Sequence, residues 1–149
     1  MILDTRTQFC DGVSLDTSGT GTVLLGDVID LSAADLDLGQ GEPLYLVLQA
    51  TEDAASSNST ATVQFALVSD DSADIATDGT QTTLIETAEF SVDEITDGTR
   101  LACIALPSGD YEEFLGIQQI TGTEAVSAGA VDAFLTLDPT GWKAYPDGI

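Results

Sequence analysis

The sequence predicts an all-β protein, a jelly-roll-like β-sandwich of about eight antiparallel strands. Short segments alternate between apolar and polar side chains, and glycine-marked turns separate them at intervals of about 8–15 residues. No segment shows a convincing helical period. The stretch Leu106–Asp138 carries the pattern most clearly, with these residues on alternate positions of two strands: Leu115 and Ile117, then Val131, Ala133, Leu135 and Leu137.

The first third of the chain begins with an extended arm or edge strand at Met1–Asp11, followed by a turn cluster at 16–21. The next strand places Val23, Leu25, Ile29 and Leu31 at one parity. Gly26 interrupts this strand and predicts a bend or bulge there. Residues 30–41 are acidic and small, typical of an irregular connection or a short helical turn.

Residues 44–50 form a strand that is apolar on both faces, which is typical of a central strand covered on two sides. A polar loop follows at 52–59. The clearest alternation comes next, at 60–69, and predicts a half-buried strand. Residues 70–80 form a long acidic loop.

The last third contains a mixed strand at 82–90, a polar turn at 92–98 and a strand at 99–106 that is again apolar on both faces. An aromatic tail follows Pro139. We therefore expect a single domain over residues 1–149, with an N-terminal arm at 1–11 and a C-terminal tail at 139–149. The N-terminus lacks the basic and apolar regions of a signal peptide, and no apolar run is long enough for a membrane helix.

The charge is strongly one-sided. Lys and Arg number 3 against 26 Asp and Glu, for a formal net charge of −23. A field of that sign repels phosphate backbones and anionic lipids, so we expect neither nucleic acid nor membrane as a partner. Salt screens the self-repulsion, which fits a marine or saline setting.

Two isolated cysteines do not make a disulfide framework, although Cys10 and Cys103 could pair. Cys103 lies in an apolar run, where a buried free thiol is the ordinary interpretation. Histidine is absent, which removes the commonest general base and metal ligand. Acidic pairs such as Glu112 and Glu113 arise by chance in so acidic a chain, so we expect no enzymatic activity and no cofactor.

The acidic loop at 70–80 is a candidate calcium site. Asp70, Asp71, Asp74 and Asp78 lie within one loop and offer the oxygen ligands that a hard cation prefers. Their spacing does not match an EF-hand, and a solvated acidic loop is the ordinary interpretation. The alternative function that this loop supports is a calcium-dependent carbohydrate-binding or adhesin jelly roll. A third interpretation is that the acidity is salt adaptation alone.

Three short motifs resemble those of a known family. They are MILD at Met1–Asp4 with Phe9, GEPLYLVLQ at Gly41–Gln49, and the LPSG turn with the closing strands. In these the chain resembles the jelly-roll cement, or capsid decoration, proteins of short-tailed bacteriophages. The resemblance covers the opening, the central strand and the C-terminal third. Residues 52–98 carry little of it.

The resemblance implies a virion structural protein on the outer surface of a capsid, made in the host cytoplasm. Its implied partners are an HK97-type major capsid protein and other copies of itself, a dimer being favoured over a trimer. Relatives often carry a basic residue where this chain has Glu112 and Glu113. Aromatic and arm residues are natural anchors, and the predicted contact residues are Met1, Ile2, Leu3, Arg6, Phe9, Trp142 and Tyr145.

Overall fold

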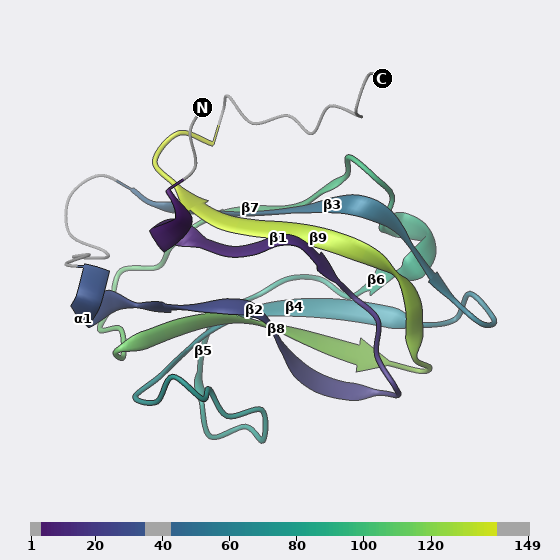
Figure 1. The fold of residues 1–149 in the computed structure, drawn as a ribbon, viewed down its shortest axis with the longest axis horizontal. Helices are drawn as coiled ribbons and strands as arrows, with labels where there is room; N and C mark the ends of the chain where they lie inside the picture. Colours follow the sequence, from purple (N-terminus) through teal and green to yellow (C-terminus); the bar gives the residue numbers. More distant parts are fainter. Residues whose placement is uncertain (1–3, 35–42, 140–149) are drawn as a thin grey trace.

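The computed structural model describes residues 4–34 and 43–139, which form two antiparallel sheets packed face to face (Figure 1). Within these residues, three short helices accompany the strands: η1 (Thr5–Thr7), α1 (Leu31–Ala34) and η2 (Val92–Glu94). The strands are β1 (Gln8–Ser14), β2 (Gly21–Asp30), β3 (Tyr45–Ser56), β4 (Thr62–Asp70), β5 (Thr82–Glu86), β6 (Phe90–Ser91), β7 (Arg100–Ala105), β8 (Phe114–Gly122) and β9 (Val126–Thr136). The predicted β-sandwich is confirmed.

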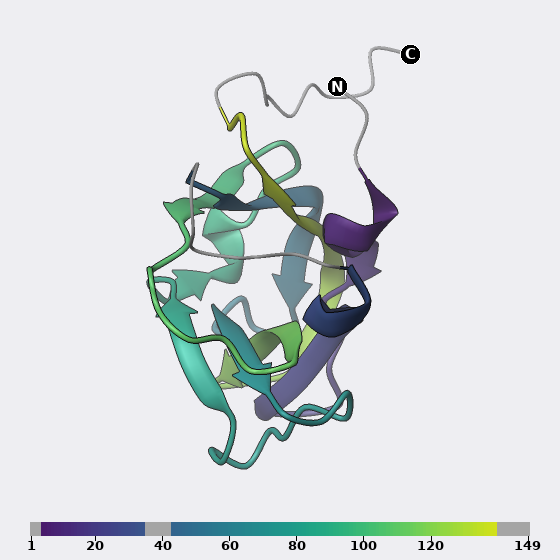
Figure 2. The ribbon, with the colours of Figure 1, turned by 90° about the vertical axis from the view of Figure 1, so that its left-hand side faces the viewer.

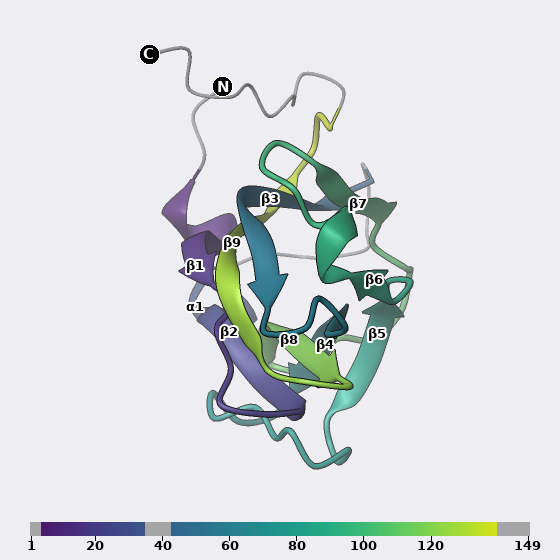
Figure 3. The same ribbon diagram turned by 90° about the vertical axis from the view of Figure 1, so that its right-hand side faces the viewer.

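The strand order is that of a jelly roll. One sheet runs β1-β9-β3-β7, and the other runs β2-β8-β4-β5 with β6 also pairing with β4. Counting β5 and β6 as one interrupted strand gives eight strands. The chain crosses between the sheets at most connections, so sequence neighbours such as β1 and β2 lie in opposite layers (Figures 2 and 3). This wrapping of two Greek keys distinguishes a jelly roll from a simple meander.

The core lies between the two sheets, and the predicted alternation fills it. From β4 and the residue before it, Ala61, Val63, Phe65 and Leu67 all point inward and are buried. β8 contributes Leu115 and Ile117, and β9 contributes Val131, Ala133 and Leu135. Leu137, predicted to share that face, follows the end of β9 and is 60% exposed.

The structure separates the two strands of the Leu106–Asp138 stretch. β8 belongs to the five-stranded sheet and pairs with β2 and β4, whereas β9 belongs to the other sheet and pairs with β1 and β3. The short connection between them turns the chain from one layer to the other. Alternation fixes which face of a strand is buried, but it does not fix the strand beside it.

The predicted bulge at Gly26 is confirmed. The β2–β8 register shifts between Leu25 and Ile29, and Gly26 has φ +63°. A Cβ atom at Gly26 would lie 2.0 Å from the carbonyl oxygen of Phe9. This position therefore brings β1 and β2 together where the two sheets meet.

Two segments predicted as loops carry more structure than expected. β3 continues to Ser56, so most of the polar stretch 52–59 is strand. The acidic loop after β4 folds over the outer face of the five-stranded sheet, where Ile75 is buried in a second apolar cluster with Ala66 and Val68. Gln118 reinforces this contact, since its Nε2 donates to the carbonyl of Ala76.

The strand at 99–106 is not a central strand like β3, despite its apolar character. β7 pairs with β3 on one side and ends the four-stranded sheet on the other. Cys103 is therefore exposed, which corrects the expected buried thiol, while Cys10 is buried. Both cysteines are free. Among the described residues, no helix is both long and apolar enough to cross a membrane.

Candidate functional site

The N-terminal contact residues divide into one exposed and one buried. Arg6 lies in η1, is exposed, and pairs with Asp4 at 3.1 Å between Nη2 and Oδ2. Phe9 lies in β1 and is 1% exposed, because it packs in the core. The prediction of Phe9 as a contact residue is therefore wrong for this fold, since the alternation of β1 turns its ring inward. Outside the described residues lie the other predicted contacts, Met1, Ile2, Leu3, Trp142 and Tyr145.

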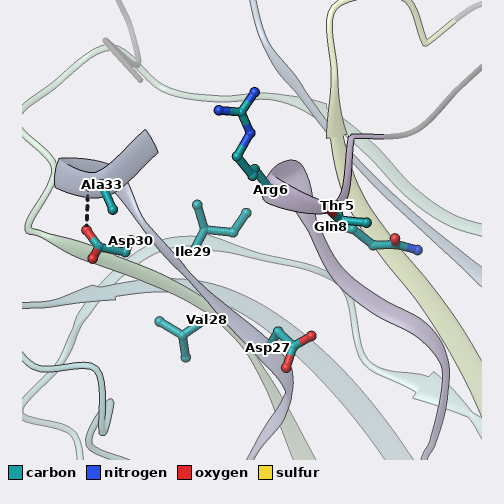
Figure 4. A pocket seen from close by; sticks show the side chains of 8 residues that line it. All are labelled: Thr5, Arg6, Gln8, Asp27, Val28, Ile29, Asp30 and Ala33. Atoms are coloured by element: carbon teal, nitrogen blue, oxygen red, sulfur yellow. Dashed lines mark hydrogen bonds between the residues drawn. The ribbon is translucent and has the colours of Figure 1, made fainter. Parts of the chain in front are cut away.

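A surface hollow of about 380 Å³ lies beside Arg6, between the start of β1 and the end of β2 (Figure 4). Its lining combines one cation, two carboxylates and a few apolar side chains: Thr5, Arg6, Gln8, Asp27, Val28, Ile29, Asp30 and Ala33. In Figure 4 the Arg6 guanidinium stands away from both Asp27 and Asp30. The lining of the hollow thus carries charges of both signs.

Local hydrogen bonds fix the charges around this hollow. The hydrogen bonds from the Arg6 side chain and backbone N–H lower the pKa of Asp4, and Asp4 in turn raises the pKa of Arg6. Asp30 Oδ1 accepts from Ser32 Oγ at 2.7 Å and from the Ala33 N–H at 3.0 Å. These bonds lower the pKa of Asp30 and cap α1. Arg6 and Asp30 therefore both carry their charge at neutral pH.

Both predicted contact segments join the sandwich at one end of the four-stranded sheet. Gln8, the first residue of β1, pairs with Phe134 near the end of β9. The described chain begins at Asp4 and ends at Pro139, a few residues beyond this pair. The arm and the tail are therefore attached to adjacent strands, which the sequence did not predict.

Two of the four aspartates of the candidate calcium loop, Asp70 and Asp78, accept hydrogen bonds from the loop itself. Asp70 accepts from the backbone N–H groups of Ser72 and Ala76, and Asp78 accepts from Thr80. Within residues 4–34 and 43–139, no three carboxylates or thiols come together as a metal site would require. The structure does not gather Asp70, Asp71, Asp74 and Asp78 into one.

Other carboxylates of the described chain join neighbouring segments. Glu112 accepts hydrogen bonds from Ser69 and Thr82, whereas Glu113 accepts one from Ser32. Glu124 accepts from the backbone and side chain of Asn58 and from Thr60. These hydrogen bonds lower the pKa of Glu124 to about 2. These carboxylates hold neighbouring loops in place. Glu112 and Glu113, although adjacent, bind different residues.

Comparison with protein families identifies the family of the chain. Residues 14–135 match the family described as Bbp16, which spans the chain from the last residue of β1 to the penultimate residue of β9. The chain belongs to the Bbp16 family. This family is phage-associated, which agrees with a bacteriophage origin for the chain. A comparison with curated proteins finds no match.

The Bbp16 match covers most of the jelly roll but neither end of the chain. It includes the five-stranded sheet, the acidic loop, β3, β7 and almost all of β9, but it leaves out β1 except Ser14, and with it Phe9, as well as Arg6 and the aromatic tail. The predicted contacts in the arm and tail are thus features of this chain beyond the matched region. Sequence reasoning missed that no strand of the described residues pairs with the outer edge of β7. The run of small and apolar residues after Arg100 was its signal, but a buried strand gives the same signal.

Proposed function

We propose that this Bbp16 family protein is a capsid cement protein. It binds the outer surface of an HK97-type major capsid protein shell and holds neighbouring subunits against the pressure of packaged DNA. The family match over nearly the whole jelly roll carries the proposal, because it gives a phage association to the domain itself. The cement-protein motifs in the sequence support it, and so does the fold that they imply.

The charge suits a protein that works beside densely packed DNA without binding it. A net charge of −23 repels nucleic acid at any distance that salt does not screen. The charge also favours a shell surface with positive patches as the partner. In this role the protein needs neither catalysis nor a cofactor.

Contacts repeated over an icosahedral shell need not be strong one by one. A homo-oligomer, with a dimer favoured, engages several subunits at once, and linked binding raises the overall affinity by orders of magnitude. We propose Arg6 with its hollow as one contact, and Met1–Leu3, Trp142 and Tyr145 as the arm and tail contacts. Phe9 supports the arm from within the core.

The proposal is tested on particles of the phage that encodes the chain, prepared without this protein. Added protein should bind in stoichiometric amounts and raise the temperature at which the particles release DNA. Removal of residues 1–3, or Trp142→Ala, should lower occupancy, whereas Trp142→Phe, which keeps an aromatic ring, should lower it less. Absence of the protein from purified virions, together with no binding to stripped particles, would reject the cement function.

A further inference from the structure

We propose that the outer edge of β7 accepts an extended segment of the shell protein as an additional β-strand. Strand addition of this kind gains affinity from main-chain hydrogen bonds and specificity from side chains on alternate positions. The identity of the partner rests on the proposed function. The chemistry of the edge rests on this chain alone.

The register of β7 shows which backbone groups face outward. Tyr45 pairs with Ala105, and the Leu106 N–H donates to the Leu44 carbonyl at 2.8 Å. That bond joins the residues next to Tyr45 and Ala105. Tyr45 and Ala105 are therefore a non-hydrogen-bonded pair of the antiparallel ladder. Since such pairs alternate with hydrogen-bonded ones, Cys103 and Ala105 direct their N–H and C=O groups away from β3. Both residues therefore offer the edge a donor and an acceptor.

The other sheet edges carry the devices that discourage pairing. Natural edge strands are protected by charges, bulges or shortness. β1 carries Asp11 and has two register shifts against β9, while β2 carries Asp27 and the Gly26 bulge. β5 is five residues long, ends with Glu86 and pairs irregularly. From Ala102 to Ala105, β7 pairs regularly with β3 and has no charge.

The side chains along this edge are small or apolar and open to solvent. Cys103, Ile104 and Ala105 are all exposed, and Ile104 is one of three large apolar side chains that the described chain exposes. In Figure 3, β7 lies at the outer side of the sheet, beyond β3. An added strand would cover these side chains and satisfy the outward backbone groups.

Charge favours a partner protein over a second copy of this chain. Acidic residues stand before and after β7, at Asp97 and Asp110. Antiparallel pairing of two copies about Cys103 would bring Asp97 of one copy towards Asp110 of the other at both ends. Like charges brought face to face destabilise a strand pair. A strand with an apolar centre and basic flanks instead meets opposite charge at Asp97 and Asp110, and the exposed Arg100 at the start of β7 requires a neutral or acidic residue directly opposite it.

Hydrogen–deuterium exchange on the full chain tests the edge, in the free protein and on particles stripped of it. Peptides spanning Leu101–Leu106 should exchange quickly in the free protein and become protected on the particle. A particle-free probe is a short synthetic peptide with an apolar centre of valines and with lysines at both ends. It should give the same protection, whereas its glutamate counterpart should give none.

A matched pair of variants isolates the outward groups. Ala105→Pro removes an N–H that the β3–β7 ladder does not use, and proline is tolerated on edges where the N–H faces solvent. It should weaken binding to particles and to the lysine peptide about tenfold, the equivalent of one or two lost hydrogen bonds. Ala105→Ser retains the N–H and should bind like the parent. Equal unfolding midpoints of the two variants show that folding is intact.

Each outcome decides a different point. Particle binding without protection of β7 overturns the inference and leaves the cement function standing. Concentration-dependent protection in the free protein overturns the partner assignment, because the edge then belongs to a second copy. Protection by the lysine peptide without particle binding supports the edge and rejects the cement function. Protection by neither probe overturns the inference.

Discussion

At the scale of single residues, Gly26 combines two requirements that glycine alone meets. Its φ of +63° disfavours a side chain, and an added Cβ would overlap the Phe9 carbonyl. We expect Gly26→Ala to lower the free energy of unfolding by about 3 kcal/mol, from backbone strain and overpacking together. Urea unfolding followed by circular dichroism measures the change.

Gly12 provides the matched control for that substitution. Gly12 has a similar φ of +58°, but nothing lies within 4 Å of an added Cβ atom. Gly12→Ala therefore strains only the backbone and should lower the free energy of unfolding by about 1 kcal/mol. Equal losses for the two variants would show that the approach to Phe9 does not constrain the fold.

The two thiols should differ sharply in reactivity. Burial raises the pKa of Cys10 to about 12, and the nearby carboxylates of Asp132 and Asp27 add to the effect. Cys103 is exposed on β7. Because the thiolate is the reactive form, a thiol reagent should label one cysteine per native chain and two after unfolding. Cys103→Ser should abolish the native reaction, and persistence of labelling in that variant would contradict the assigned burial.

At the scale of elements, Ile75 anchors the acidic loop to the sheet. Its side chain packs over Gly116 and is buried with Ala66 and Val68. We expect Ile75→Ala to cost about 2 kcal/mol, at the low end for a buried isoleucine because the cluster is small. Residues 71–81 should also become sensitive to proteolysis while the rest of the fold persists. Ile75→Val is the mild control, and a loop that stays resistant in Ile75→Ala would argue that its hydrogen bonds alone hold it.

Glu124 links the β3–β4 turn to the β8–β9 turn, and its contribution depends on pH. Hydrogen bonds from Asn58 come first among the causes that lower its pKa from 4.5 to about 2. A carboxylate with a depressed folded pKa stabilises the protein above its unfolded pKa, and this stabilisation is lost as pH falls through the folded value. Glu124→Gln should therefore be less stable than the parent at pH 7. The gap in urea midpoint should close between pH 4.5 and about 2, and a gap independent of pH would assign the effect to shape instead.

At the scale of the whole molecule, 26 acidic residues against three cations make stability depend on ionic strength. The Debye length falls from about 30 Å at 0.01 M to about 3 Å at 1 M salt. We expect the thermal midpoint to rise by several degrees over that range, equally in sodium and potassium chloride. Calorimetry measures the midpoint in each salt.

A charge variant separates screening from other effects of salt. Asp71, Glu89 and Asp110 make no side-chain hydrogen bond or ion pair within the described residues. The combined change Asp71→Asn, Glu89→Gln and Asp110→Asn should raise the midpoint at low salt and reduce its dependence on salt. A salt response unchanged by the variant would count against self-repulsion as its cause.

Individual residues show how much of the structure the sequence alone predicts. Ala61, Val63, Phe65 and Leu67 alternate with polar residues, so their inward face was predictable, as was the bulge at Gly26. Cys103 and Phe9 were misplaced because an apolar residue looks alike in a buried strand, an edge strand and an exposed arm. Arg6 and Phe9 were both predicted as contacts of one arm, yet Arg6 in η1 is exposed and Phe9 in β1 is buried in the core.

The sequence by itself determined the fold class, the buried face of most strands and the acidic surface, because side-chain alternation and charge act locally. Only the tertiary structure decided that β8 and β9 lie in opposite sheets and that β7 is a free edge. It also decided that Asp70 and Asp78 hold the loop after β4 through hydrogen bonds to its backbone. These features depend on which strands pair across the two sheets, and that choice follows from packing the entire core at once.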